Sequence, residues 1–190
     1  AGKPVLRRTV EALRADSRIE HIMCVIHADD HALYEECMGD DFSLIHYPVT
    51  GGATRQASVL AGLEAMAALN PKHVLIHDGA RPFLSSQLLD TLIDGLQNHQ
   101  AILPALQVVD TLQSVDDNQL CLSTVPREGL WRAQTPQAFQ FESILAAHRT
   151  VEGHDLTDDV AVARAAGLQV TAVDGSESNF KLTTEADFVR

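Results

Sequence analysis

The sequence has few positive charges and no long apolar run, and each shortage excludes a class of protein. Lysine and arginine together number 14 against 26 aspartate and glutamate residues, which gives a formal net charge of −12. A surface this acidic argues against a protein that binds nucleic acid or an anionic membrane. No stretch approaches the roughly 18 apolar residues of a membrane span, and no signal-peptide pattern opens the chain.

Cysteine and the common catalytic motifs are also scarce. Cys24, Cys37 and Cys121 are odd in number and scattered, without the spacing of a zinc site. They favour a reduced compartment, so we expect a cytoplasmic protein. The sequence contains no G-x-S-x-G, no Walker loop and no G-x-G-x-x-G. The nine histidines fall in different expected elements, so we predict structural or surface roles for most of them and no histidine site.

What the sequence does contain is a regular alternation of strand-like and helix-like segments. Its 190 residues and 45% hydrophobic content are ordinary for one globular domain with a substantial core. The alternation predicts an α/β fold with a parallel, doubly wound sheet. Helices are expected at 4–15, 31–38, 55–69, 85–96, 141–148 and 156–166 (the last capped by Thr157 or Asp155), with a final one that is capped by Thr183 or Thr184 and still continues at Arg190. Strands are expected at 22–26, 44–47, 73–77, 101–109 and 169–173.

The segment 73–82 is central to the prediction. An apolar run from His73 to His77 leads directly into Asp78-Gly79-Ala80-Arg81-Pro82. Such a run predicts a buried strand that ends at the carboxyl edge of the sheet, where open α/β sheets bind ligands. Asp78 could contact a metal or a hydroxyl group there, and Arg81 a phosphate or carboxylate. The alternative is an ordinary capped turn after a strand.

A second candidate site is the loop Gly51-Gly52-Ala53-Thr54, which joins a strand to a helix. Two glycines allow the backbone to approach a flat or anionic ligand, and the following helix offers free N–H groups. Ser58 on the first helical turns could hydrogen-bond a base. A flexible loop with a normal helix cap is an equally good interpretation.

Three further charged positions have simple structural alternatives. Arg127 could form a surface ion pair with Glu128, and Lys181 could be solvated. The pair Asp158-Asp159 could mimic a metal-binding acid pair, but more often it is helix N-terminal charge, which the helix dipole favours.

The alternation breaks at Asp110. The segments 111–115 and 120–125, with a turn at 116–119, predict a β-hairpin. This arm, at about 110–135, could reach a partner subunit. At the other end, the sequence opens almost inside a helix with no strand before it, so we expect upstream residues to be missing.

Several stretches together resemble the 2-C-methyl-D-erythritol 4-phosphate cytidylyltransferases of the non-mevalonate isoprenoid pathway. In order and spacing they cover nearly the whole chain. They are Gly51-Gly52-x-x-Arg55-x-x-Ser58-Val59-x-x-Gly62-Leu63, His77-Asp78-Gly79-Ala80-Arg81-Pro82, Asp110-Thr111, Arg127-x-Gly129-Leu130-Trp131-x-Ala133-Gln134-Thr135-Pro136-Gln137, Thr157-Asp158-Asp159 and Asn179-x-Lys181-Leu182-Thr183.

The resemblance implies a Rossmann-like nucleotidyltransferase fold, with a mostly parallel sheet, helices on both faces and a protruding hairpin arm. It also implies a homodimer built with that arm, and a reaction that depends on Mg²⁺ or another divalent cation. CTP and methylerythritol phosphate would give cytidine diphosphate methylerythritol and pyrophosphate. The implied nucleotide-binding residues are Gly51, Gly52, Ser58 and Asp78, with Asp78 also a metal ligand. The implied acceptor-binding residues are Arg81, Thr111, Thr135 and Lys181. Arg127 and Lys181 would position the substrate for attack, with Arg127 supplied by the neighbouring subunit.

One family feature has no counterpart in the sequence. The family begins with a strand and a glycine-rich loop that contains an arginine and is followed by Pro-Lys-Gln, and nothing here matches them. We therefore expect this strand and loop to be missing from the chain 1–190. A fused cyclodiphosphate synthase domain, as in some bacteria, stays an open alternative. So do another sugar- or polyol-phosphate nucleotidyltransferase, such as a ribitol phosphate cytidylyltransferase, and a catalytically inactive nucleotide-binding module.

Overall fold

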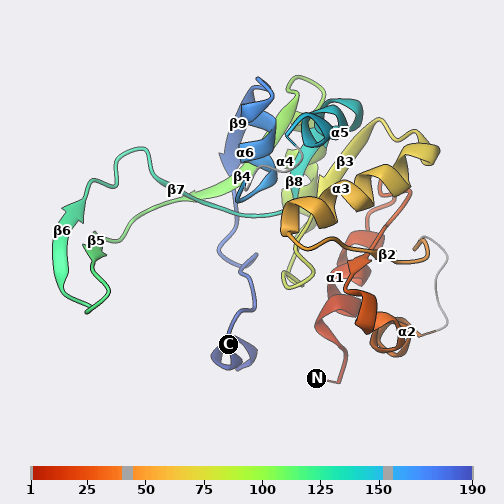
Figure 1. The fold of residues 1–190 in the computed structure, drawn as a ribbon, viewed down its shortest axis with the longest axis horizontal. Helices are drawn as coiled ribbons and strands as arrows, with labels where there is room; N and C mark the ends of the chain where they lie inside the picture. The colour runs from red at the N-terminus through yellow and green to blue at the C-terminus, as the bar shows by residue number, and fades with distance from the viewer. Residues whose placement is uncertain (1, 40–44, 152–155, 190) are drawn as a thin grey trace.

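The computed structural model describes residues 2–39, 45–151 and 156–189, and shows a central sheet covered by helices, with a separate hairpin (Figure 1). The α-helices are α1 (Val5–Arg14), α2 (His31–Met38), α3 (Arg55–Met66), α4 (Ser86–Gly95), α5 (Phe141–Thr150) and α6 (Asp159–Ala165), and the 3₁₀ helices are η1 (Ala28–Asp30), η2 (Ala67–Leu69) and η3 (Glu185–Phe188). The strands are β1 (Val25–Ile26), β2 (Val49–Thr50), β3 (His73–Ile76), β4 (Ala101–Gln107), β5 (Leu112–Val115), β6 (Cys121–Val125), β7 (Trp131–Ala133), β8 (Gln137–Gln140) and β9 (Val170–Asp174).

The predicted α/β class is confirmed, with strands of opposite direction added to the parallel ones. The largest sheet has the order β3-β8-β4-β7, and β9 also pairs with β4. Because β8 is antiparallel to both β3 and β4, those two strands share one direction, and β9 is parallel to β4. The pair β1–β2 is parallel as well. Strands β7 and β8, which interrupt the doubly wound pattern, were not predicted.

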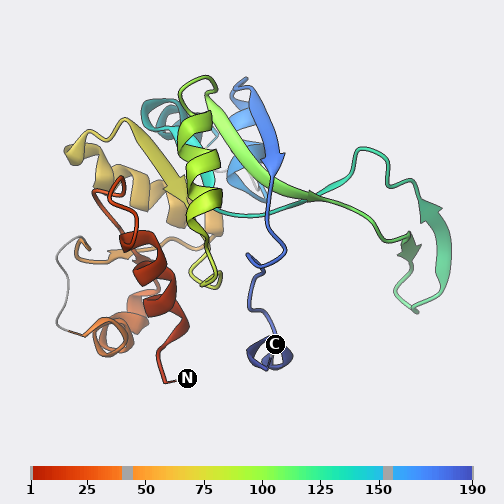
Figure 2. The same cartoon turned by 180° about the vertical axis from the view of Figure 1, so that it is seen from behind.

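Helices cover both faces of this sheet, as Figures 1 and 2 show from opposite sides. Side chains alternate along a strand with a period of two, so neighbouring residues reach opposite faces. One face packs against α3, α5 and α6 through Val74, Ala101 and Phe139. The other packs against α4 through Leu75, Ile102 and Ala138. Burial on both sides explains why these strands have continuous apolar runs instead of alternating ones.

A smaller core lies around the first two helices. Val10 of α1 and Tyr34 of α2 pack against Ile22 and Cys24. The predicted strand 22–26 is shorter than expected, because only its last two residues form β1, and Ile22 makes an isolated parallel bridge to Ile45. The strand expected at 44–47 begins outside the described residues, and the partner of β1 is β2, later in the chain.

The predicted hairpin is confirmed. Strands β5 and β6 pair in antiparallel fashion, and both views show them projecting from the body on the side away from α1 and α2. The turn is held by the Asp116 carboxylate, whose Oδ1 accepts from the backbone N–H groups of Asn118 and Leu120, each at 2.9 Å. Every residue of β6 is exposed. Among the described residues, β6 therefore has β5 as its only pairing partner and is not covered by the body of the chain.

Two predicted helices differ from the structure at their ends. Helix α6 is capped by Asp158, whose side chain accepts from the Ala161 N–H at 2.8 Å, so Thr157 is not the cap, and Asp155 lies outside the described residues. The predicted terminal helix is only the 3₁₀ turn η3, closed by a capping box between Thr184 and Asp187. Among the described residues, no helix is both long and apolar enough to cross a membrane.

Candidate functional site

The site is built on the end of β3, where the chain turns from Asp78 to Arg81. The Arg81 N–H donates to the Asp78 carbonyl at 3.0 Å and closes the turn. The Asp78 carboxylate, 17% exposed, lies 3.1 Å from the Lys181 ammonium and 3.4 Å from Nε of Arg81. Burial acts to raise the pKa of Asp78, but the Lys181 hydrogen bond and the charges of Lys181, Arg81 and Arg55 outweigh it and hold that pKa below its ordinary value. Asp78 is therefore ionised at neutral pH.

Lys181 reaches this carboxylate because the segment that carries it is pinned to the same turn. The Leu182 N–H donates to the Ala80 carbonyl at 2.9 Å. Nη1 of Arg81 donates to the Asn179 carbonyl at 2.7 Å. Arg81 is only 11% exposed, so much of its hydrogen-bonding capacity holds the turn and the segment before Lys181 together. The turn is therefore more than a simple capped turn, and Lys181, although exposed, is held by an ion pair with Asp78.

Thr135 approaches Asp78 from the segment that precedes β8. Its hydroxyl accepts from the Asp78 N–H at 3.0 Å and lies 3.0 Å from Nδ1 of His77. The other ring nitrogen of His77 lies 3.1 Å from the Arg81 carbonyl. Burial lowers the pKa of His77 to about 4, so the imidazole is neutral at pH 7. The structure thus brings four of the predicted site residues to one place: Asp78, Arg81, Thr135 and Lys181.

The glycine loop lies against the start of α3. A Cβ on Gly51 would lie 2.6 Å from Oγ of Ser58, and one on Gly52 would lie 2.5 Å from the Ala57 Cβ. These glycines are therefore required by the close approach of the loop to its own helix. Ser58 donates to the Thr54 carbonyl at 2.9 Å, which leaves its hydroxyl oxygen able to accept.

An ion pair to a buried carboxylate fixes the first residue of α3. Nη2 of Arg55 lies 2.7 Å from Oδ2 of Asp159, whose side chain is fully buried, and Oδ1 of Asp159 lies 3.2 Å from Nε2 of the equally buried His148. The second residue of the Asp158-Asp159 pair is thus a buried countercharge and not a metal ligand. The sequence analysis gave Arg55 and His148 no such role, because their partners are distant in the chain.

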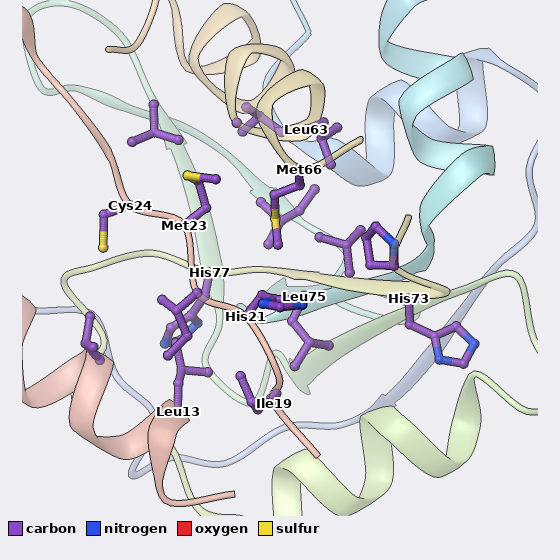
Figure 3. Close-up of a pocket in the computed structure, with 18 of the residues that line it drawn as sticks. Leu13, Ile19, His21, Met23, Cys24, Leu63, Met66, His73, Leu75 and His77 are labelled. Carbon is purple, nitrogen blue, oxygen red and sulfur yellow. The ribbon is translucent and has the colours of Figure 1, made fainter. Parts of the chain in front are cut away.

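A cavity of about 620 Å³ connects these two parts of the site. Arg55 and Ser58 line it from α3, and Asp78 and Gly79 line it from the end of β3. The rest of its wall is mostly apolar. Figure 3 shows Leu13, Ile19, Met23, Leu63, Met66 and Leu75 turned toward it from α1, α3, β3 and the segment before β1.

Thr111 and Arg127 are not brought to this site within the chain. Both are exposed on the arm, and Figure 1 shows the arm projecting away from the end of β3. Arg127 donates through Nη1 to the carbonyl of Val109 in the same arm, and the described residues give it no ion pair with Glu128. A role for either residue in a site therefore requires a second molecule.

The described residues contain no group of three His, Cys, Asp or Glu side chains that could hold a metal by itself. Asp78 is the one carboxylate at the strand edge. Magnesium usually retains several waters and binds through one or two carboxylates together with substrate phosphates. The residues present fit an ion of that kind, held largely by a phosphate ligand.

Comparison with known proteins identifies the family. The family model described as 2-C-methyl-D-erythritol 4-phosphate cytidylyltransferase matches residues 1–190. The chain belongs to this family. The resemblance recognised in the sequence is confirmed.

Relatives and solved structures agree with this assignment. A bifunctional enzyme IspD/IspF of Paramagnetospirillum magneticum is 47% identical over the whole chain, which covers 49% of that protein. A 2-C-methyl-D-erythritol 4-phosphate cytidylyltransferase of Cereibacter sphaeroides is 45% identical over the whole chain, which covers 83% of it. The crystal structure of the cytidylyltransferase from Thermus thermophilus superposes with a TM-score of 0.84 at 31% identity, covering 100% of this chain and 87% of that one. The chain thus spans about half the length of the bifunctional relative.

Membership of the cytidylyltransferase family also shows what the sequence analysis missed. His77 and Arg55 both lie inside the family motifs that the sequence displayed, but neither received a role. Their position within a motif was the available signal. Their partners, Thr135 and Asp159, could not be assigned from spacing alone.

Proposed function

We propose that the chain transfers the cytidylyl group of CTP to 2-C-methyl-D-erythritol 4-phosphate in non-mevalonate isoprenoid biosynthesis. A phosphate oxygen of the acceptor attacks the α-phosphorus of CTP. The bond from that phosphorus to the oxygen bridging to the β-phosphate breaks, and pyrophosphate leaves. The observation that supports this most is the Asp78, Arg81 and Lys181 cluster at the carboxyl edge of β3, in a chain matched throughout by the family model.

In this proposal the residues act by position and charge. Nucleotidyl transfer relies on orientation and on neutralising phosphate charge more than on covalent help from the protein. The Lys181 side chain is 46% exposed, so its ammonium can contact a ligand phosphate while Asp78 holds it in place. Arg81 fixes the turn that presents both. Gly51, Gly52 and Ser58 form the base-binding wall, since the two glycines lie against the start of α3 and the Ser58 oxygen can accept a hydrogen bond.

We also propose a Mg²⁺ requirement, in which Asp78 is the protein ligand and nucleotide phosphates supply much of the remaining coordination. When bound, the ion would neutralise negative charge on the phosphates. Asp78 is ionised, as a protein ligand of Mg²⁺ must be. Its Oδ2 also lies 3.1 Å from the Lys181 ammonium.

A homodimer completes the site in this proposal. Large apolar side chains are exposed along the arm, and patches of this kind mark protein contacts. An isolated two-stranded hairpin is at best marginally stable in water. The exposed residues are Val109, Val115, Leu120, Leu122, Leu130 and Trp131. The arm would pack on a second copy and carry Thr111 and Arg127 to the partner's site.

We further propose one domain over 1–190, whose cavity is filled by a β-strand between β1 and β3. Each of these strands pairs on one edge only among the described residues, β1 with β2 and β3 with β8, and residues of both strands line the cavity. Apolar walls line it from both sides of the sheet.

This strand fits the expectation of a missing N-terminal strand with its glycine-rich loop. The test compares urea unfolding of the 190-residue chain and of the full-length protein that contains it. We expect the longer protein to unfold at higher urea, and to protect the amides of β1 and β3 from hydrogen exchange. Equal protection in both would contradict the proposal.

A cytoplasmic location is proposed on the free thiols of Cys24, Cys37 and Cys121.

Thermal unfolding with different nucleotides tests the function itself. A ligand that binds the folded state stabilises it by mass action, by about 2.7 kcal/mol at a hundredfold excess over its dissociation constant. We expect CTP to raise the melting temperature of the full-length protein more than UTP, ATP or GTP does. Equal shifts with CTP and UTP would contradict the cytosine pocket. Turnover with methylerythritol phosphate against ribitol phosphate then identifies the acceptor.

A further inference from the structure

His77 bridges two parts of the site, and its hydrogen bonds define which ring nitrogen carries the proton. A carbonyl oxygen can only accept, so Nε2, which lies 3.1 Å from the Arg81 carbonyl, must donate. In the neutral imidazole Nδ1 is then an acceptor. The Thr135 hydroxyl, 3.0 Å from Nδ1, therefore donates its proton to His77.

The hydroxyl group of Thr135 is therefore hydrogen-bonded to partners within the protein. Its oxygen accepts from the Asp78 N–H at 3.0 Å while its proton goes to His77. Its carbonyl accepts from Nδ2 of Asn179 at 2.8 Å. The residue is only 5% exposed. A phosphate oxygen accepts hydrogen bonds and cannot donate, so it would have to compete with His77 for the one hydroxyl proton of Thr135.

We propose that His77 is a positioning residue that acts through Thr135 to fix the backbone of Asp78, and with it the carboxylate that holds Lys181. The proposal rests on the proposed cytidylyl transfer. In this proposal Thr135 acts on Asp78, and His77 is the residue that orients it. The same imidazole supports the Arg81 carbonyl, so one buried ring defines both ends of the Asp78–Arg81 turn.

The first test is spectroscopic and needs no turnover. Long-range ¹H–¹⁵N NMR spectra of the full-length protein distinguish protonated from unprotonated ring nitrogens, and the His77 signals are assigned by their absence in His77→Asn. We expect a protonated Nε2 and an unprotonated Nδ1, and we expect Thr135→Val to shift the Nδ1 resonance. A protonated Nδ1, or signals that Thr135→Val leaves unchanged, would overturn the proposal.

The second test is a double-mutant cycle in kcat and KM. His77→Leu removes both ring hydrogen bonds, and Thr135→Val removes the hydroxyl at nearly constant volume. Since small misplacements can lower the rate about a hundredfold, we expect each variant to lower kcat by about ten- to a hundredfold. Because the two residues act as a unit, the double variant should be no worse than the poorer single one. KM for CTP should stay within about threefold, since the Gly51–Ser58 wall is unchanged.

Two conservative variants control for the possibility that His77→Leu or Thr135→Val loses activity because it does not fold. His77→Asn can still accept from Thr135, because its Oδ1 lies near the position of Nδ1, and Thr135→Ser keeps the hydroxyl. Both should retain turnover within about fivefold of wild type. Losses that multiply in the double variant would mean that His77 and Thr135 act independently and would overturn the proposal. A wild-type protein that makes no cytidylyl product would instead refute the proposed function, and the NMR result would still decide the hydrogen-bond chain.

Discussion

Asp78 is the residue to which the cations of the site converge, since Lys181 and Arg81 both contact its Oδ2. Asp78→Asn keeps the size and removes the charge. We expect turnover to fall by about a hundredfold, because Lys181 loses the group that holds it and Mg²⁺ loses its protein ligand. The free energy of unfolding should fall by about 1–3 kcal/mol, the usual value of hydrogen bonds to a charged group.

Kinetics over a Mg²⁺ titration and urea unfolding measure both quantities. Asp94→Asn removes an exposed acid from α4 and serves as the control, with both quantities unchanged. Full activity of Asp78→Asn with the same Mg²⁺ optimum would remove Asp78 from the site.

The lowered pKa of His77 predicts how the free energy of unfolding depends on pH. Its pKa is lowered from 6.5 to about 4 by burial, so between those pH values the unfolded chain binds a proton that the folded protein does not. Neutral His77 therefore contributes its full stability above pH 6.5, and this contribution is lost as pH falls toward 4. The loss is about 3 kcal/mol over the window.

Urea unfolding of wild type and His77→Gln between pH 7 and pH 4, in the presence of EDTA, isolates this term. We expect the wild type to be favoured most at pH 7, and the difference in unfolding free energy between the two proteins to shrink as the pH falls. Curves that stay parallel across the window would show that His77 titrates alike in the folded and unfolded states.

Among the helices, one buried carboxylate links three of them. Asp159 begins α6 and contacts Arg55 at the start of α3 and His148 in α5. Asp159→Asn should lower the free energy of unfolding by about 1.5–3 kcal/mol, because it removes the charge-assisted hydrogen bond to Arg55, whose side chain is 39% exposed and stays solvated. The adjacent Asp158→Asn is a matched control: it should cost under about 1 kcal/mol, since Asn caps a helix as well as Asp does. Similar losses in both would mean that the carboxylate charge of Asp159 contributes little.

The helices and most strands were predictable because their apolar spacing is local. Strand β8 was not, although Phe139 is fully buried. It is four residues long, begins and ends in glutamine, and follows Pro136. Its strand conformation comes from β3 and β4 on either side, and neither neighbour is adjacent in the sequence. For residues 22–26 the prediction failed in the opposite way, because a strand was expected over the whole segment and only Val25–Ile26 form one. An apolar run alone does not supply a pairing partner.

In the molecule as a whole, the predicted site residues divide according to where their partners lie. Asp78, Arg81 and Lys181 were found from motifs, and the fold brings them together. The hydrogen bond from Thr135 to His77 spans 58 residues, and the Arg55–Asp159 bond spans 104. Contacts of that sequence separation depend on the sheet order, which the sequence did not reveal because β8 was missed. Thr111 and Arg127 remain predictions, since their proposed partner is a second molecule.

The arm gives the last prediction. Arg127 is exposed on the arm, whose hairpin projects away from the body of the molecule (Figure 1), so a role at an acceptor phosphate must be carried out in the partner's site. Its planar guanidinium can grip a phosphate through two charge-assisted hydrogen bonds. Arg127→Ala should therefore lower acceptor turnover about a hundredfold and leave CTP binding nearly intact.

Mixing two defective subunits tests the trans arrangement. Arg127→Ala subunits keep an intact nucleotide wall, and Ser58→Trp subunits block that wall but keep the arginine. Each parent dimer should be poor. After subunit exchange, a mixed dimer has one working site, formed by the wall of the first subunit and the arginine of the second. With equal amounts and random pairing, half of the dimers are mixed, so about a quarter of wild-type activity should return. If exchange is verified by mass measurement and no activity returns, Arg127 does not act across the dimer.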